Sequence, residues 1–158
     1  MNFLTEHGIS SYGELESKLN AVSARRDTAH AEIKRIESRS AELALVMKHA
    51  ETYRQLKPLY DRYRKSNDKE KFLRGHESEI ILFEAAAREL KRLGAVPLPT
   101  TESMKTELAN LNAEKERLLA EYKAARTEAQ EYDTVKQNVD ALLTVPKEQE
   151  QQRRHELE

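Results

Sequence analysis

The sequence predicts an all-α protein, an elongated antiparallel coiled-coil hairpin of two long helices with one or two short helices packed at one end. Helix-forming residues dominate, and only four Gly and four Pro interrupt the 158 residues. Charged residues make up 35% and hydrophobic residues 38%, which is too polar for a thick globular core but too patterned for disorder. Two long stretches repeat apolar residues in alternate steps of three and four, the spacing of a coiled coil.

The first long helix is predicted over about residues 11–64. Ser11, followed three residues later by Glu14, has the spacing of a capping box at a helix start. Arg26 and Ser40 interrupt the apolar seam, and Pro58 is expected to kink the helix because it removes one backbone donor. The apolar positions of the seam are Leu15, Leu19, Val22, Ala29, Ile33, Ile36, Leu43, Met47 and Ala50.

Two short helices are predicted next, over about residues 68–75 and 77–93. Gly94 is the expected stop of the second one, and the two prolines within residues 96–99 predict an extended connector. The 77–93 helix is apolar over a broad face. We therefore expect it to pack across the Pro58 end of the first long helix and to form a small three-helix head.

The last long helix is predicted over about residues 101–144, capped by Thr100 or Thr101 and ended by Pro146. Lys115 is a polar member of its seam. The seam positions are Met104, Leu108, Leu111, Lys115, Leu118, Tyr122, Ala125, Ala129, Tyr132, Val135, Val139 and Leu142.

Residues 1–146 are predicted to form a single helical module. Residues 147–158 offer no apolar anchor, so we expect a disordered tail. Its last two residues, Leu157 and Glu158, resemble a cloning remnant ahead of a purification tag.

The intervening short helices supply a return path, which favours pairing of the two long helices within one chain. Placing Arg64 level with Thr101 sets Ser40 opposite Ala125 and Leu43 opposite Tyr122. The first helix then overhangs at its start, where a second chain would dock on Leu15, Leu19 and Val22. The protein is therefore expected to be a monomer or a weak homodimer.

The residue types argue against chemistry on this chain. It has no Cys, and its five His show no metal-binding spacing. There is no phosphate-binding Gly-rich loop and no nucleophile motif. We therefore expect no enzyme activity, no cofactor and no metal. No apolar run reaches the roughly 20 residues of a membrane span, and the absence of Cys and of a signal peptide favours a cytoplasmic location.

The strongest local signal is positive charge. The net charge of the chain is −1, so a nucleic-acid partner would have to be met by a local patch. Residues 51–74 hold eight basic and four acidic residues. Such a basic segment could neutralise nucleic-acid phosphates, and the alternative is a solvated helix face. The candidate nucleic-acid-binding residues are Arg54, Lys57, Arg62, Arg64, Lys65, Lys69, Lys71 and Arg74.

Aromatic residues are interleaved with these cations. Tyr53, Tyr60 and Tyr63 have two interpretations, as base-stacking residues or as core residues. They continue the apolar stripe at helical spacing, which favours the core.

The middle and end of the chain resemble a known family. The segments concerned are Leu59–Lys65, Lys71–Leu73, His76–Glu77, Glu79–Leu82, Ala85–Ala87, Leu93–Gly94, Leu98–Pro99 and Val135–Leu143. In order and spacing they are similar to the C-terminal helical region of relaxase/mobilisation nucleases carried by conjugative elements of Gram-positive bacteria. The resemblance spans about Phe3 to Leu143.

The resemblance implies plasmid transfer by conjugation, in which the parent protein nicks DNA. The Tyr nucleophile and the His-coordinated metal of the family belong to an N-terminal nuclease domain, so no catalytic residue is carried over to this chain. The resemblance therefore implies a non-catalytic accessory module that binds DNA, or that holds other relaxosome or transfer proteins near the nuclease. The alternative is a structural coiled-coil scaffold that binds only protein partners.

Overall fold

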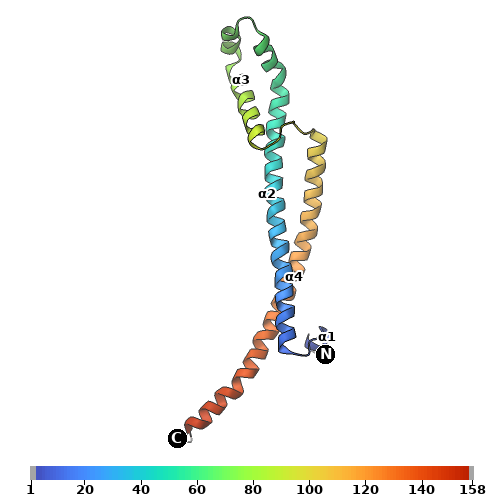
Figure 1. The fold of residues 1–158 in the computed structure, drawn as a ribbon, viewed down its shortest axis with the longest axis vertical. Coiled ribbons are helices and arrows are strands. Elements are labelled where there is room, and N and C mark those ends of the chain that lie inside the picture. The colour runs from blue at the N-terminus through green and yellow to red at the C-terminus, as the bar shows by residue number, and fades with distance from the viewer. Residues whose placement is uncertain (1–2, 157–158) are drawn as a thin grey trace. The chain divides into compact units, whose positions relative to one another are not determined.

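The computed structural model describes the backbone of residues 3–156 and the side chains of residues 3–143. Its helices are α1 (Phe3–Glu6), α2 (Tyr12–Lys65), α3 (Lys69–Arg92) and α4 (Thr101–Glu156), and residues 3–156 contain no strand (Figure 1). The all-α prediction with two long paired helices is confirmed. The chain divides into two compact units, one of Met1–Ile33 with Glu116–Glu158 and one of Lys34–Lys115, where the sequence predicted a single module. We call them unit 1 and unit 2.

Helix α2 begins with the predicted cap. The Ser11 hydroxyl accepts a hydrogen bond from the Glu14 N–H at 3.2 Å. The Glu14 carboxylate in turn accepts the Ser10 N–H at 2.7 Å, so the reciprocal bond of the capping box falls one residue earlier than expected. This bond lowers the pKa of Glu14. Further along, α2 continues through Pro58 as one helix to Lys65.

Unit 1 is a narrow helix pair closed by the N-terminal segment. Leu15 and Val22 of α2 are buried against Ala125, Ala129 and Tyr132 of α4. Small side chains on one helix let its partner approach closely, which suits a core of only two helices. Within this unit Arg25 pairs with Glu128 at 3.7 Å, Lys136 pairs with Glu16 at 3.8 Å, and Tyr12 donates to Asp140 at 2.6 Å.

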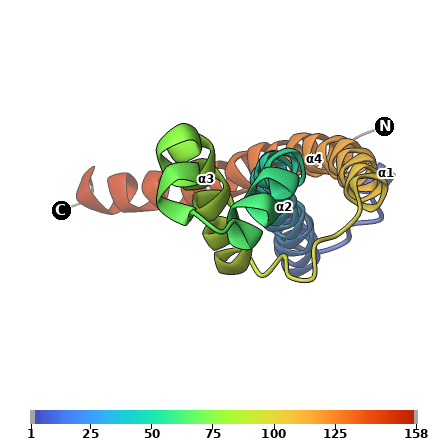
Figure 2. The ribbon, with the colours of Figure 1, turned by 90° about the horizontal axis from the view of Figure 1, so that it is seen from above.

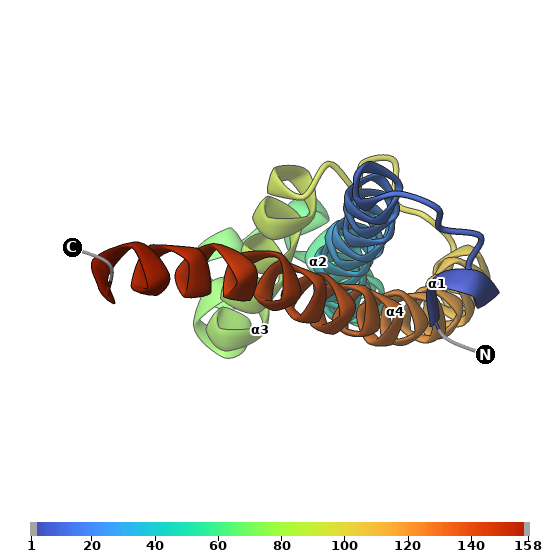
Figure 3. The same ribbon diagram turned by 90° about the horizontal axis from the view of Figure 1, so that it is seen from below.

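The overhang predicted at the start of the first long helix is wrong. Leu15 is 1% exposed and Val22 is 6% exposed, and Leu19 packs against the same cluster. The short helix α1 lies beside α4 (Figure 3). It adds to this cover, because the Phe3 ring lies 4.9 Å from the Tyr132 ring. These residues are therefore not free to dock a second chain.

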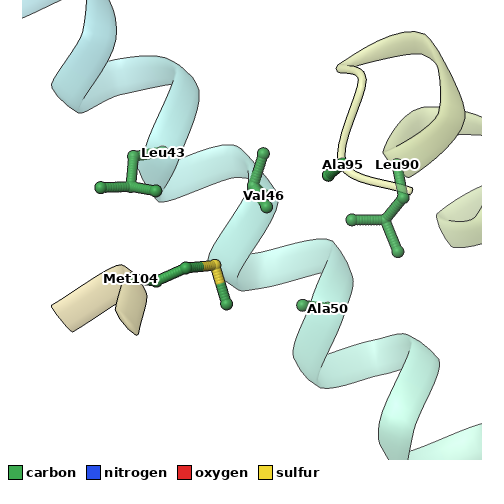
Figure 4. Close-up of a cluster of buried hydrophobic side chains, with 6 residues drawn as sticks. All are labelled: Leu43, Val46, Ala50, Leu90, Ala95 and Met104. Atoms are coloured by element: carbon green, nitrogen blue, oxygen red, sulfur yellow. The ribbon is translucent and has the colours of Figure 1, made fainter. Parts of the chain in front are cut away.

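Unit 2 has a wider core, to which three helices contribute. Side chains of α2, α3, the 93–100 connector and α4 meet in one cluster (Figure 4). Its buried members are Leu43, Val46, Ala50, Leu90, Ala95 and Met104. The three-helix head is thus present, although the cluster extends along α2 well before Pro58.

Helix α3 contains the predicted division into two shorter segments. His76 has φ −137° and ψ 26°, which is not helical and kinks α3 between the segments expected at 68–75 and 77–93. Asp68 caps the first segment by accepting the Lys71 N–H at 3.1 Å. The second segment ends at Arg92, and Gly94 has the positive φ of 71° that favours glycine.

The predicted pairing of Arg64 with Thr101 is wrong. Arg54 donates to the Thr101 hydroxyl at 2.7 Å, about three helical turns earlier on α2. Leu43 packs near Met104 instead of Tyr122, and Ala125 packs near Leu15 and not Ser40. The reason is that α3, which is 24 residues long, runs back along α2 (Figure 1) before the connector crosses to α4 (Figure 2).

The end of α4 also differs from the prediction. The helix extends to Glu156 and so does not end at Pro146 or give way to a disordered tail. A proline removes one hydrogen bond from a helix, and the Lys, Glu, Gln and Arg residues that follow have high helix propensity. Leu142, predicted in the seam, is 73% exposed. Leu157 and Glu158 lie outside the described residues.

Candidate nucleic-acid interface

All eight candidate basic residues are exposed and belong to unit 2. They lie on the last turns of α2 and the first turns of α3, on either side of the turn formed by Ser66, Asn67 and Asp68 (Figure 1). We call the six that flank this turn the basic tip. They are Arg62, Arg64, Lys65, Lys69, Lys71 and Arg74.

The other two candidates are engaged within the chain. Arg54 donates to the Thr101 hydroxyl at 2.7 Å and to the Pro99 carbonyl at 2.5 Å, which ties the start of α4 to α2. Lys57 pairs with Asp61 at 3.0 Å, and the hydrogen bond to this carboxylate raises the pKa of Lys57. Their charges are therefore less available to a ligand than those of the basic tip.

Most of the basic tip has no partner of opposite charge. Arg62 lies over the Phe72 ring at 5.8 Å, and Arg74 donates to the Glu70 carbonyl at 3.4 Å. Among the described residues, no ion pair or side-chain hydrogen bond engages the charged groups of the remaining four. These four are Arg64, Lys65, Lys69 and Lys71.

The acidic residues of this segment do not cancel its charge. Residues 62–74 hold six basic residues against Asp68 and Glu70, a net charge of +4. The Asp68 carboxylate already accepts the Lys71 N–H at the start of α3. Positive potential is therefore concentrated around one turn of the chain, where an anion can approach from solvent.

Helix dipoles separate the tip cations into two groups. Arg64 and Lys65 lie in the last turn of α2, where positive charge stabilises the carboxyl end of a helix. Lys69 and Lys71 lie in the first turn of α3, where positive charge is unfavourable by about 0.3–1 kcal/mol per residue. Helix stability therefore explains why cations stand at Arg64 and Lys65. It does not explain the cations at Lys69 and Lys71, so these two lysines are the stronger candidates for binding an anion.

The aromatic residues of this region pack inside the unit. Phe83 stacks on Tyr53 at 4.8 Å and on Tyr60 at 4.3 Å between ring centres. Tyr63 lies 6.0 Å from Phe72. Tyr53, Tyr60 and Tyr63 are half-buried and each contacts a ring of α3, which favours the core interpretation.

The sequence missed one feature near these cations. A groove of about 440 Å³ lies between α2 and the start of α4. Lys48, Arg54 and Lys105 contribute positive charge to it, Glu51 contributes negative charge, and Met47 and Met104 line its base. The sequence did not predict that Lys105 lies near Arg54, because the position along α2 at which α4 starts depends on how α3 folds back.

Two further properties concern the described part of the chain. No group of three or more His, Asp or Glu side chains there is placed to hold a metal ion. None of its helices combines the length and the apolar character needed to cross a membrane. Comparison of the chain with protein-family models, with curated proteins and with solved structures gives no match.

Proposed function

We propose that this chain is a non-catalytic accessory module of a cytoplasmic DNA relaxase or mobilisation protein, and that it binds DNA through the basic tip during conjugative transfer. The family resemblance of residues 3–143 supplies the biological setting. The observation that carries the DNA contact is the group of four tip cations without an intramolecular partner, next to a turn that solvent reaches from outside.

Phosphate neutralisation is the chemistry that such a group supports. Each Lys or Arg that contacts a DNA phosphate releases condensed counterions, so affinity falls steeply as salt rises. Arg64, Lys65, Lys69 and Lys71 can each approach a phosphate without first breaking an ion pair within the chain. Arg54 and Lys57 would lose existing partners on the same approach.

The direct test is charge reversal at the tip. The triple variant Arg64→Glu, Lys65→Glu, Arg74→Glu should abolish DNA binding measured by fluorescence anisotropy at about 50 mM NaCl. The matched control Lys34→Glu, Lys123→Glu, Arg126→Glu makes the same change in net charge on exposed helical positions that do not belong to the tip. It should keep at least about half of the wild-type affinity, since long-range effects of exposed charges are screened. Equal losses in both variants, or no binding by the wild type, would refute the proposal.

A test in the parent protein addresses the wider role. Deleting residues 1–146 from the full relaxase should leave nicking of a purified origin intact and lower mobilisation frequency in mating assays. This outcome follows from an accessory role, since no catalytic group is assigned to the module. Unchanged mobilisation would show that the module is dispensable for transfer.

The scaffold alternative also has an observation in its favour. Leu142 and Leu143 are 73% and 59% exposed, beyond the last partly buried seam residue Val139. Such a pair suits a contact with another relaxosome or transfer protein, or with a second copy in a weak homodimer. Sedimentation at two concentrations tests the homodimer, and Leu142→Asp with Leu143→Asp should abolish any dimer found.

A further inference from the structure

We infer that the basic tip binds the phosphate backbone of duplex DNA, without base stacking and without base-sequence preference. This inference rests on the proposed function and specifies its substrate. Three features of unit 2 support it: the occupied aromatic rings, the width of the helix pair, and the unfavourable placement of two lysines.

The aromatic rings next to the tip are not free to stack on bases. Single-strand binding without sequence preference depends on such stacking, worth about 1–3 kcal/mol per base. Phe72 is in contact with Tyr63 at 6.0 Å, with His76 at 4.7 Å and with the Arg62 guanidinium at 5.8 Å. Tyr60 is stacked on Phe83, which is itself only 5% exposed. A single strand would therefore have to compete with these contacts in order to stack on the half-buried rings of Tyr63 and Phe72.

The width of the helix pair prevents both helices from entering one groove together. The Tyr63–Phe72 contact holds the end of α2 against the start of α3. Two packed helices, each about 10–12 Å thick with axes about 8–10 Å apart, measure roughly 20 Å across. The major groove of B-DNA is about 12 Å wide and the minor groove about 6 Å. A pair wider than either groove meets the phosphates at the groove edges first.

The charge density of the ligand favours duplex DNA over single-stranded DNA. A duplex carries one negative charge per about 1.7 Å of axis, whereas each strand alone contributes one per about 3.4 Å. Arg64 and Lys65 on α2 and Lys69 and Lys71 on α3 lie within a few residues of one turn, so their reach matches closely spaced charges. An anion of high charge density also offsets the cost of Lys69 and Lys71 at the start of α3.

The experiment compares two forms of DNA bound by the 158-residue chain. Labelled duplexes of about 20 base pairs in two unrelated sequences and an oligo-dT of the same length are titrated at about 50 mM and about 200 mM NaCl. We expect the duplexes to bind at least about threefold more tightly than oligo-dT, and the two duplexes to agree within about twofold. Loss of two phosphate contacts in Lys69→Ala, Lys71→Ala should lower the slope of log affinity against log salt by about 2. The matched control Lys34→Ala, Lys123→Ala should leave this slope unchanged.

A second variant tests the stacking argument separately. Phe72→Leu keeps an apolar side chain in the α2–α3 contact and removes the ring. It should change duplex affinity by less than about twofold, with helicity checked by circular dichroism.

The outcomes separate this inference from the proposed function. Tighter binding of oligo-dT than of duplex, a marked difference between the two duplexes, or loss of binding by folded Phe72→Leu protein would overturn the inference and leave DNA binding in place. Binding of neither form at about 50 mM NaCl would overturn both.

Discussion

Units 1 and 2 use the same two long helices and bury them in different ways. In unit 1 the core between α2 and α4 is a narrow seam in which alanines are prominent, including Ala29, Ala125 and Ala129. In unit 2 α3 adds a third helix, and the core combines Leu43, Phe83 and Met104 with three alanines of its own, Ala50, Ala86 and Ala95. A two-helix core depends on close backbone approach, whereas a three-helix core depends on filling volume.

Charge divides the units in the same way. Residues 34–115 hold 17 Lys or Arg and 13 Asp or Glu, a net charge of +4. The residues of unit 1 hold 10 basic and 15 acidic residues, a net charge of −5. The overall charge of −1 is therefore the sum of a positive unit 2 and a negative unit 1. A polyanion partner should therefore bind unit 2 and not unit 1.

The largest expected effect is on the wide core of unit 2. Phe83→Ala removes the ring that stacks on Tyr53 and Tyr60, so it should lower the free energy of unfolding by about 3–5 kcal/mol in urea denaturation. The matched control is Leu82→Ala, whose side chain is 56% exposed and should cost less than about 0.5 kcal/mol. Hydrogen exchange should accelerate more within Lys34–Lys115 than in unit 1. Equal acceleration in both units would remove the distinction between them.

The next effect is on the narrow seam of unit 1. Ala125 is fully buried, so Ala125→Leu should force the two helices apart and lower the free energy of unfolding by about 1–3 kcal/mol. Its neighbour Ala124 is exposed, and Ala124→Leu makes the same chemical change with an expected effect below about 0.5 kcal/mol. Urea denaturation of both variants measures the difference. Similar values for the two would mean that close approach of the helices is not what holds unit 1 together.

The smallest effect concerns the cap of α2 in unit 1. The Ser10 N–H lowers the pKa of Glu14 below its ordinary value of 4.5, so the ionised carboxylate stabilises the folded state. This contribution is present above the unfolded pKa and is lost as pH falls through the lower folded pKa. Glu14→Gln should therefore have a lower urea midpoint than wild type at about pH 7, with the gap closing towards about pH 3. Glu116→Gln, at an exposed position on α4, should show no such gap. A gap that stays constant with pH would contradict the capping role.

Much of the fold was predictable because it depends on local periodicity. The apolar spacing alone identified Leu15, Ile36, Leu43 and Met104 as seam positions, and all four are buried. Ser11 was recognisable as a cap, since capping depends on residues three apart in the chain. The candidate cations could be named for the same reason, because they are close together in sequence.

Which helix faces which, and at what level, depended on contacts between distant residues. The sequence could not show how far α3 runs back along α2, and this distance places Thr101 opposite Arg54 instead of Arg64. For the same reason the sequence did not predict that Leu15 and Val22 are buried against α4. It also did not predict that Arg54 is hydrogen-bonded within the chain while the Lys69 and Lys71 side chains are exposed.

By itself, then, the sequence determined the helical class, the two seams, the caps and the basic segment, because each follows from spacing along a single helix. The tertiary structure alone decided the pairing level of α2 and α4, the division into two units and the subset of cations left for a ligand. Two helices whose apolar seams repeat every seven residues can shift along each other by whole repeats and still bring apolar residues together. Only the packing of α3 and the connector selects one alignment.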